Sequence, residues 1–172
     1  MLEARALVDN LERVKKKVMG LGGVSKGCYA CKNFIFKSWT GPVYLRLRVY
    51  SKNNWPSRQV IVTHKKAVAL GFGKKDVILL RQEFDDLDQG FAFISNKFPG
   101  FQKILEFAVC GEEFSLGSSR FFVENVEFVG PSVEIEVNTE DELKKYFTLI
   151  GAGKMIEGSL PEYILKSKPI SS

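Results

Sequence analysis

The sequence predicts an α+β fold: a closed or nearly closed antiparallel β-barrel, a tunnel of about eight strands, with helices packed outside. Three observations support it. Short stretches rich in β-branched and aromatic residues alternate polar with apolar side chains, and turn residues separate them. Three other segments repeat apolar residues at helical spacing. Charged residues recur two positions apart within the strand-like stretches, which places both members of a pair on one face.

The length of 172 residues fits one domain, 1–172, with a core of about residues 1–165 and a tail, 166–172, that can fray. Hydrophobic residues make up 45% and charged residues 26%, as in an ordinary globular protein. The chain begins without the pattern of a secretory signal and contains no long uninterrupted apolar run. We therefore expect a cytoplasmic protein, a monomer or homodimer with no membrane contact.

Helices are expected over Asp9–Leu21, over Asp88 to about Phe98, and after Thr139. In the third, Glu142 completes a capping pair with Thr139, and Gly151 ends the helix. Strands fill most of the remaining chain, and no internal repeat or Pro/Ser-rich linker marks a domain boundary.

The paired polar residues supply the functional hypothesis. On any single strand, the common arrangement is a charged face turned to water. If the sheet closes, the same face becomes a lining, where converging carboxylates repel unless a hard cation such as Mg²⁺ lies between them. Arginines there would hold phosphate oxygens. The pairs are Glu3 with Arg5, Arg46 with Arg48, Thr63 with Lys65, Arg81 with Glu83 and Asp85, Arg120 with Glu124, and Glu134 with Glu136.

Together these residues resemble the CYTH, or triphosphate-tunnel, family, which includes class IV adenylate cyclases, thiamine triphosphatases and inorganic triphosphatases. The resemblance extends from Glu3 to about Leu165 and rests on the order of several short motifs. The matches are Met1-Leu2-Glu3-Ala4-Arg5 for E-x-E-x-K, Gly20-Leu21-Gly22-Gly23 for the end of the next helix, Leu45-Arg46-Leu47-Arg48 for L-R-x-R, Thr63-His64-Lys65 for T-x-K, Arg81-Gln82-Glu83-Phe84-Asp85 for R-x-E-x-E, and Glu124 followed by Gly130-Pro131-Ser132-Val133-Glu134-Ile135-Glu136 for G-x-F-x-E-x-E.

The resemblance implies a Mg²⁺- or Mn²⁺-dependent phosphohydrolase of inorganic tripolyphosphate, thiamine triphosphate or a nucleoside triphosphate. Alternatives are an adenylate cyclase that makes cyclic AMP from ATP and a non-catalytic binder of polyphosphate or nucleotide. By resemblance, the metal ligands are Glu3, Glu134 and Glu136, assisted by Glu124. The implied catalytic residues are Glu3, Arg5 and Lys65. The implied phosphate ligands are Arg5, Arg46, Arg48, Lys65, Arg81, Lys103 and Arg120, and Glu83 and Asp85 are further acidic lining residues.

Two positions depart from the family pattern. Met1 stands where the family has its first glutamate, and Leu105 stands where the family often has an arginine after Lys103. The first change removes a carboxylate from the metal site, and Arg120 is a candidate replacement for the missing arginine. Binding of polyphosphate and metal is therefore a safer expectation than turnover.

Three other patterns carry less weight. Cys28 and Cys31 have C-x-x-C spacing, but a structural zinc site needs four ligands, and we expect these two and Cys110 to be buried thiols instead. His64 is out of phase with Lys65, so we expect a packing residue. Aromatic residues among the basic ones would suit a single-stranded nucleic-acid module, but the acidic residues would repel its phosphates. Those aromatic residues are Trp39, Tyr44, Tyr50 and Trp55.

Overall fold

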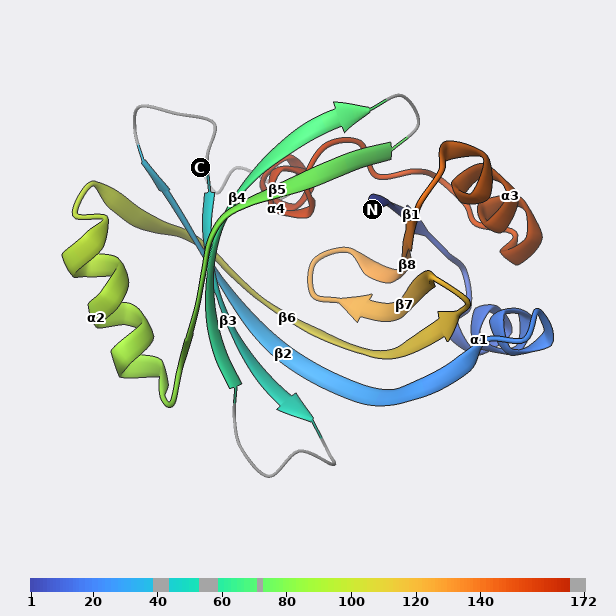
Figure 1. Cartoon of the computed structure of the whole chain (residues 1–172), viewed down its shortest axis with the longest axis horizontal. Coiled ribbons are helices and arrows are strands. Elements are labelled where there is room, and N and C mark those ends of the chain that lie inside the picture. The colour runs from blue at the N-terminus through green and yellow to red at the C-terminus, as the bar shows by residue number, and fades with distance from the viewer. Residues whose placement is uncertain (39–43, 53–58, 71–72, 168–172) are drawn as a thin grey trace. The chain divides into compact units, whose positions relative to one another are not determined.

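A computed structural model describes residues 1–38, 44–52, 59–70 and 73–167 (Figure 1). Within these ranges, side chains are described except at 52, 59, 65–70, 73, 75 and 76. The described chain forms an antiparallel sheet of eight strands and four α-helices, which confirms the predicted α+β class. The elements are β1 (Leu2–Leu7), α1 (Leu11–Gly20), β2 (Val24–Ser38), β3 (Tyr44–Lys52), β4 (Gln59–Leu70), β5 (Gly73–Phe84), α2 (Leu87–Lys97), β6 (Phe101–Leu116), β7 (Ser119–Val126), β8 (Gly130–Val137), α3 (Glu140–Ile150) and α4 (Leu160–Ser167).

The chain divides into two compact units. Unit 1 contains Met1–Cys28, Ala67–Lys75 and Cys110–Ser172, and unit 2 contains Tyr29–Lys66 and Asp76–Val109. Strands β2, β4, β5 and β6 contribute residues to both units. The single domain expected from chain length stays a prediction.

Strand β1 lies at the centre of the unit 1 sheet. It pairs along its length with β8, and β8 pairs with β7, both antiparallel. The other edge of β1 pairs with β5 at Glu3 and Lys74. Further along that edge, the segment after α3 continues the hydrogen bonding, because the Ile156 N–H donates to the Arg5 carbonyl at 2.8 Å. Backbone hydrogen bonds therefore position β1, and with it Glu3 and Arg5, from both sides.

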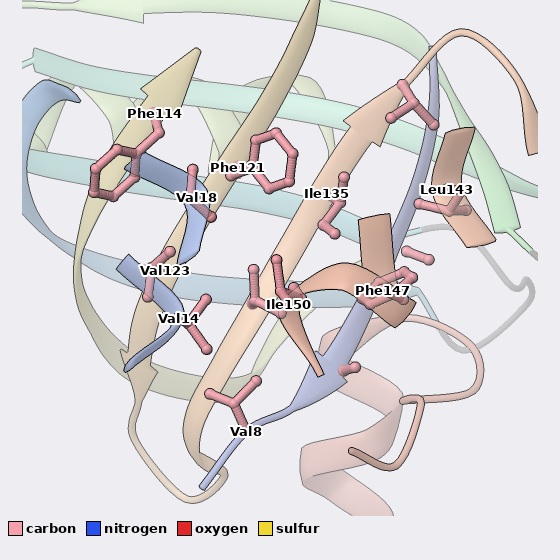
Figure 2. Packing of buried hydrophobic residues seen from close by; sticks show 14 residues of the cluster. Val8, Val14, Val18, Phe114, Phe121, Val123, Ile135, Leu143, Phe147 and Ile150 are labelled. Atoms are coloured by element: carbon pink, nitrogen blue, oxygen red, sulfur yellow. The ribbon is translucent and has the colours of Figure 1, made fainter. Parts of the chain in front are cut away.

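One face of this sheet packs against α1 and α3, as Figure 2 shows. The strand residues on this face are apolar and alternate with charged ones, as the sequence pattern predicted. Fully buried side chains from the helices meet them, which anchors the three strands as a rigid platform. The labelled members of this cluster are Val8, Val14, Val18, Phe114, Phe121, Val123, Ile135, Leu143, Phe147 and Ile150.

The helix ends agree with the predictions at α3 and differ at α1. At α3 the Thr139 hydroxyl and the Glu142 carboxylate form the predicted capping box, and Gly151 ends the helix with a positive φ of 65°. Helix α1 starts later than predicted, because Asn10 is extended and its side chain accepts from the Arg13 N–H. The sequence analysis missed α4, whose last two residues, Lys166 and Ser167, lie in the predicted tail; residues 168–172 lie outside the described structure.

In unit 2, β2, β3 and β4 form an antiparallel ladder covered on one face by α2. Gly90 of α2 lies so close to β3 that an added Cβ would come within 2.8 Å of the Leu47 side chain. The absence of a side chain at Gly90 therefore lets the helix approach the sheet.

None of the helices in the described part of the chain has the length and apolar character needed to span a membrane.

Candidate functional site

Charged side chains gather on the face of β1, β7 and β8 opposite the α1 and α3 core. Ala4 and Ile135 point into that core, so their strand neighbours point the other way. We call this surface the carboxylate face. It carries Glu3 and Arg5 of β1, Arg120 and Glu124 of β7, and Ser132, Glu134 and Glu136 of β8.

Three carboxylates on this face come close enough to share a cation. Glu3, Glu134 and Glu136 each place a ligand oxygen within 4.8 Å of the other two. Strand pairing produces this, because Glu3 lies opposite Glu136 in the ladder and Glu134 is two residues away. Oxygens on one octahedral Mg²⁺ lie about 3 Å apart when adjacent and about 4.2 Å apart when opposite, so side-chain movements of up to about 2 Å would bring the three carboxylates onto one ion. The donor set therefore fits one hard divalent ion such as Mg²⁺ or Mn²⁺.

Arg5 lies beside these carboxylates and is itself buried, with 8% of its surface exposed. Its Nη1 donates to the Glu124 carboxylate and, at 2.9 Å, to the Ser132 hydroxyl. Its Nη2 donates to Glu134 Oε2 at 3.0 Å. A buried guanidinium requires such partners, because desolvating an unpaired charge costs several kcal/mol. Arg5 thus holds two of the predicted metal-site glutamates in place.

The glutamate at position 124 fits because the neighbouring strand leaves room for it. Gly111 of β6 faces Glu124, and a Cβ there would come within 2.8 Å of Glu124 Cγ. The same Cβ would lie 2.6 Å from the Val123 carbonyl oxygen. Relieving this clash would require the paired backbone of β7 to shift. Sequence analysis missed Gly111, since a glycine inside a strand pattern signals only a close approach without naming the partner.

At the other side of the carboxylate face, Arg120 links two glutamates. Its Nη1 donates to Glu136 Oε2 at 2.9 Å, and Nε and Nη2 donate to Glu113 Oε1 at 3.2 and 3.1 Å. Burial alone would lower the pKa of Arg120, but Glu136 and Glu113 outweigh it, so the pKa is raised and the guanidinium stays charged. The structure therefore places Arg120, a predicted phosphate ligand, next to Glu136, a predicted metal ligand.

Glu113 and Lys74 are further charged residues that sequence analysis missed. Lys74, at the start of β5, places Nζ 2.9 Å from Glu3 Oε1. Glu113 follows another glutamate, Glu112, and the two point to opposite faces of β6. Only the strand register shows which of the two reaches Arg120.

Unit 2 holds the other predicted phosphate ligands. Arg46 and Arg48 share one face of β3, as their spacing predicted. Arg48 donates to Asn33 Oδ1 at 2.8 Å and to the Tyr50 hydroxyl at 2.5 Å, and its guanidinium lies over the Tyr50 ring. The side chain of Lys65 lies outside the described part of the structure.

The remaining predicted residues of unit 2 lie in exposed ion pairs or at the surface. Arg81 pairs with Glu83 at 2.8 Å, and each side chain is about half exposed. Asp85 is also exposed. Lys103 contacts Glu106 at 2.9 Å and lies over Phe34, which packs in the apolar cluster under α2. Their predicted roles in the lining stay predictions.

The residues that the sequence analysis discounted also have clear positions. His64 packs edge-on against Phe98 and Phe101, and its burial lowers its pKa, which confirms a packing residue. Cys31 is buried as expected. Cys28 and Cys110 are exposed, so the expectation of buried thiols was wrong for these two. Trp39 and Trp55 of the nucleic-acid alternative lie outside the described residues.

Comparison with known proteins identifies the fold. No family profile matches the sequence, and no curated protein matches it significantly. Solved structures do match over nearly the full length. PH1819 from Pyrococcus horikoshii OT3 has a TM-score of 0.81 at 18% identity, covering 97% of this chain and 99% of that chain.

Two further matches carry functional descriptions. HpAC1 from Hippeastrum, described as an adenylyl cyclase candidate with a dominant triphosphatase activity, has a TM-score of 0.69 at 14% identity over 99% of this chain and 97% of its own. A candidate adenylate cyclase from Vibrio parahaemolyticus has a TM-score of 0.66 at 14% identity over 95% and 96%. The chain therefore has the fold of these adenylate cyclase candidates, as its CYTH-like motifs implied, and at these identities the likeness concerns the fold alone.

Proposed function

We propose that this protein is a metal-dependent phosphohydrolase that acts on a triphosphate. The proposal rests mainly on one observation: Glu3, Glu134 and Glu136 converge with ligand oxygens within 4.8 Å of one another. Each of these carboxylates already pairs with one basic side chain, Lys74, Arg5 or Arg120, and a divalent cation, Mg²⁺ or Mn²⁺, bound between them would offset their remaining repulsion. The triphosphatase activity of HpAC1, which has the same fold, supports the reaction class by analogy.

In this proposal the sheet closes into a tunnel and the chain acts as one domain. Glu3, Glu134 and Glu136 hold the ion, and Glu124 assists through Arg5. When bound, the ion would neutralise phosphate oxygens and orient the attacking water. The predicted basic residues would bind the phosphate chain and fix it in line. These residues are Arg46, Arg48, Lys65, Arg81, Lys103 and Arg120.

The strongest alternative is a protein that binds triphosphate and metal without turning it over. Its support lies in the two positions that depart from the family pattern. The Met1 side chain is exposed and uncharged, and Leu105 is buried with 3% exposure, so neither side chain supplies the charged group of the family motif. Formation of cyclic AMP from ATP would use the same platform with a ribose hydroxyl as the nucleophile.

The test combines metal binding with product analysis. Calorimetry should show that Mn²⁺ binds to the unchanged protein and that Glu134→Gln with Glu136→Gln abolishes this binding. Incubation with tripolyphosphate, thiamine triphosphate or ATP, plus Mg²⁺ or Mn²⁺, should release phosphate that the double variant does not release. Glu157→Gln, at an exposed position outside the carboxylate face, serves as the matched charge control.

The outcomes separate the candidates. Phosphate release by the unchanged protein and by Glu157→Gln alone supports the hydrolase. Cyclic AMP as the product identifies a cyclase instead. Tight tripolyphosphate binding without any product identifies the non-catalytic binder. If Mn²⁺ does not bind, or binds equally to the double variant, the metal site and the proposal are both rejected.

A further inference from the structure

Glu113 contacts the carboxylate face through Arg120. It lies on β6, and its Oε1 accepts from both Nε and Nη2 of Arg120, at 3.2 and 3.1 Å. Two donors to one oxygen fix which edge of the guanidinium faces Glu113 and at what distance. The Phe122 ring adds a second restraint, with the guanidinium carbon 4.8 Å from its centroid. Arg120 is therefore held in one orientation.

The third donor of Arg120 points to the metal-site carboxylates. Nη1 donates to Glu136 Oε2 at 2.9 Å, and Glu136 is one of the three clustered glutamates. The Arg120 side chain is 42% exposed, whereas those of Glu113 and Glu136 are 18% and 17% exposed. Of these three groups, the cation is the most accessible to an incoming anion.

Arg120 and Arg5 thus differ in what they can bind. Arg5 is buried among Glu124, Ser132 and Glu134. Arg120 combines a fixed orientation with exposure next to Glu136. Ion pairs that water can reach contribute little to stability, so we expect the Glu113 contact to matter little for folding. The main physical effect of the Glu113 contact is to keep Arg120 in place when Glu136 binds a metal ion.

We propose that Glu113 is a positioning residue for polyphosphate, because it holds the Arg120 guanidinium beside Glu136 so that Arg120 binds a phosphate oxygen. The inference rests on the proposed metal and triphosphate site. In this arrangement Arg120 supplies the guanidinium that the chain lacks at Leu105. Without Glu113, the remaining hydrogen-bond acceptor of Arg120 among the described residues is Glu136, and Arg120 would compete with the metal ion for that carboxylate.

A double-mutant cycle tests this directly. Calorimetry measures tripolyphosphate binding at saturating Mn²⁺ for the unchanged protein, Glu113→Gln, Arg120→Gln and the double variant. We expect Arg120→Gln to weaken binding by about 10- to 100-fold, the range of a charged hydrogen bond. Glu113→Gln should weaken it by a smaller factor and should change it less than about twofold once Arg120 is already Gln.

The neighbouring glutamate supplies the matched control. Glu112 pairs with Lys15 and Ser25 on the opposite face of β6, so Glu112→Gln should leave tripolyphosphate affinity unchanged. Arg120→Lys keeps the positive charge but lacks the planar guanidinium, so Glu113→Gln should also change tripolyphosphate affinity less in that background. Circular dichroism of each variant checks that it folds.

The possible failures are distinguishable. If the Glu113 and Arg120 effects add, or if Glu113→Gln binds tripolyphosphate as tightly as the unchanged protein, Glu113 does not position Arg120, while the proposed function stands. If the unchanged protein binds neither Mn²⁺ nor tripolyphosphate, the proposed function and this inference are both overturned.

Discussion

Arg5 and Glu124 are separated by 119 positions in the sequence and form a buried ion pair on the carboxylate face. Their side chains are 9% and 7% exposed. Removing one partner of such a pair leaves the other charge buried without compensation, which costs about 3–5 kcal/mol. We expect Arg5→Met to lower the free energy of unfolding by about this amount, measured by urea denaturation at neutral pH.

A surface arginine provides the comparison. Arg13 of α1 pairs with Asp9, which precedes the helix, and its side chain is 54% exposed, so Arg13→Met should cost less than about 1 kcal/mol. Adding Glu124→Gln to Arg5→Met should recover part of the loss, because it removes the stranded charge. Equal effects of Arg5→Met and Arg13→Met would contradict a buried pair.

Gly111 should not tolerate a side chain. Alanine normally suits a strand better than glycine, so β-propensity alone predicts that Gly111→Ala would raise the free energy of unfolding. Here the added Cβ would lie 2.6 Å from the Val123 carbonyl oxygen, and this clash decides the sign. We expect Gly111→Ala to destabilise the protein by about 1–3 kcal/mol and to weaken Mn²⁺ binding by displacing Glu124. Gly20→Ala, where a Cβ meets no atom within 4 Å, should show neither effect.

His64 should make stability depend on pH near neutrality. Burial lowers its pKa below the ordinary value of 6.5, so the unfolded chain binds the proton more readily. Its contribution to stability is present above about pH 6.5 and is lost as the pH falls below that value. Since the sequence has a single histidine, NMR titration of its ring carbons reports the pKa directly. His64→Phe should lose this part of the pH dependence, and a ring that titrates at or above 6.5 would refute the assignment.

The capping box of α3 offers a test of local structure. The Thr139 side chain accepts from the Glu142 N–H at 3.2 Å, and the Glu142 carboxylate accepts from the Thr139 N–H at 3.1 Å. Thr139→Ala should cost about 1 kcal/mol in thermal or urea unfolding. Thr148→Ala, within the same helix, should cost nothing, because alanine has the higher helix propensity. A similar loss for both variants would mean that the cap is not the cause.

Some of these features were predictable because they depend on local sequence. The α3 cap was predicted because Thr139 and Glu142 are three residues apart and act within one turn. The pairing of Glu134 with Glu136 on one face was predicted because strand geometry has a period of two. The start of α1 was misplaced because Asp9 and Asn10 are both good capping residues, and propensity does not choose between neighbours.

The sequence by itself determined the class of fold, the strands with alternating charge, and the identity of the carboxylates and arginines on their polar faces. Only the tertiary structure decided how those groups combine. Strand register brought Glu3 opposite Glu136, placed Arg5 among Glu124, Ser132 and Glu134, and selected Glu113 over Glu112 as the partner of Arg120. The physical reason is that side-chain alternation is a property of one strand, whereas a site depends on the alignment between strands, which backbone hydrogen bonds and core packing fix together.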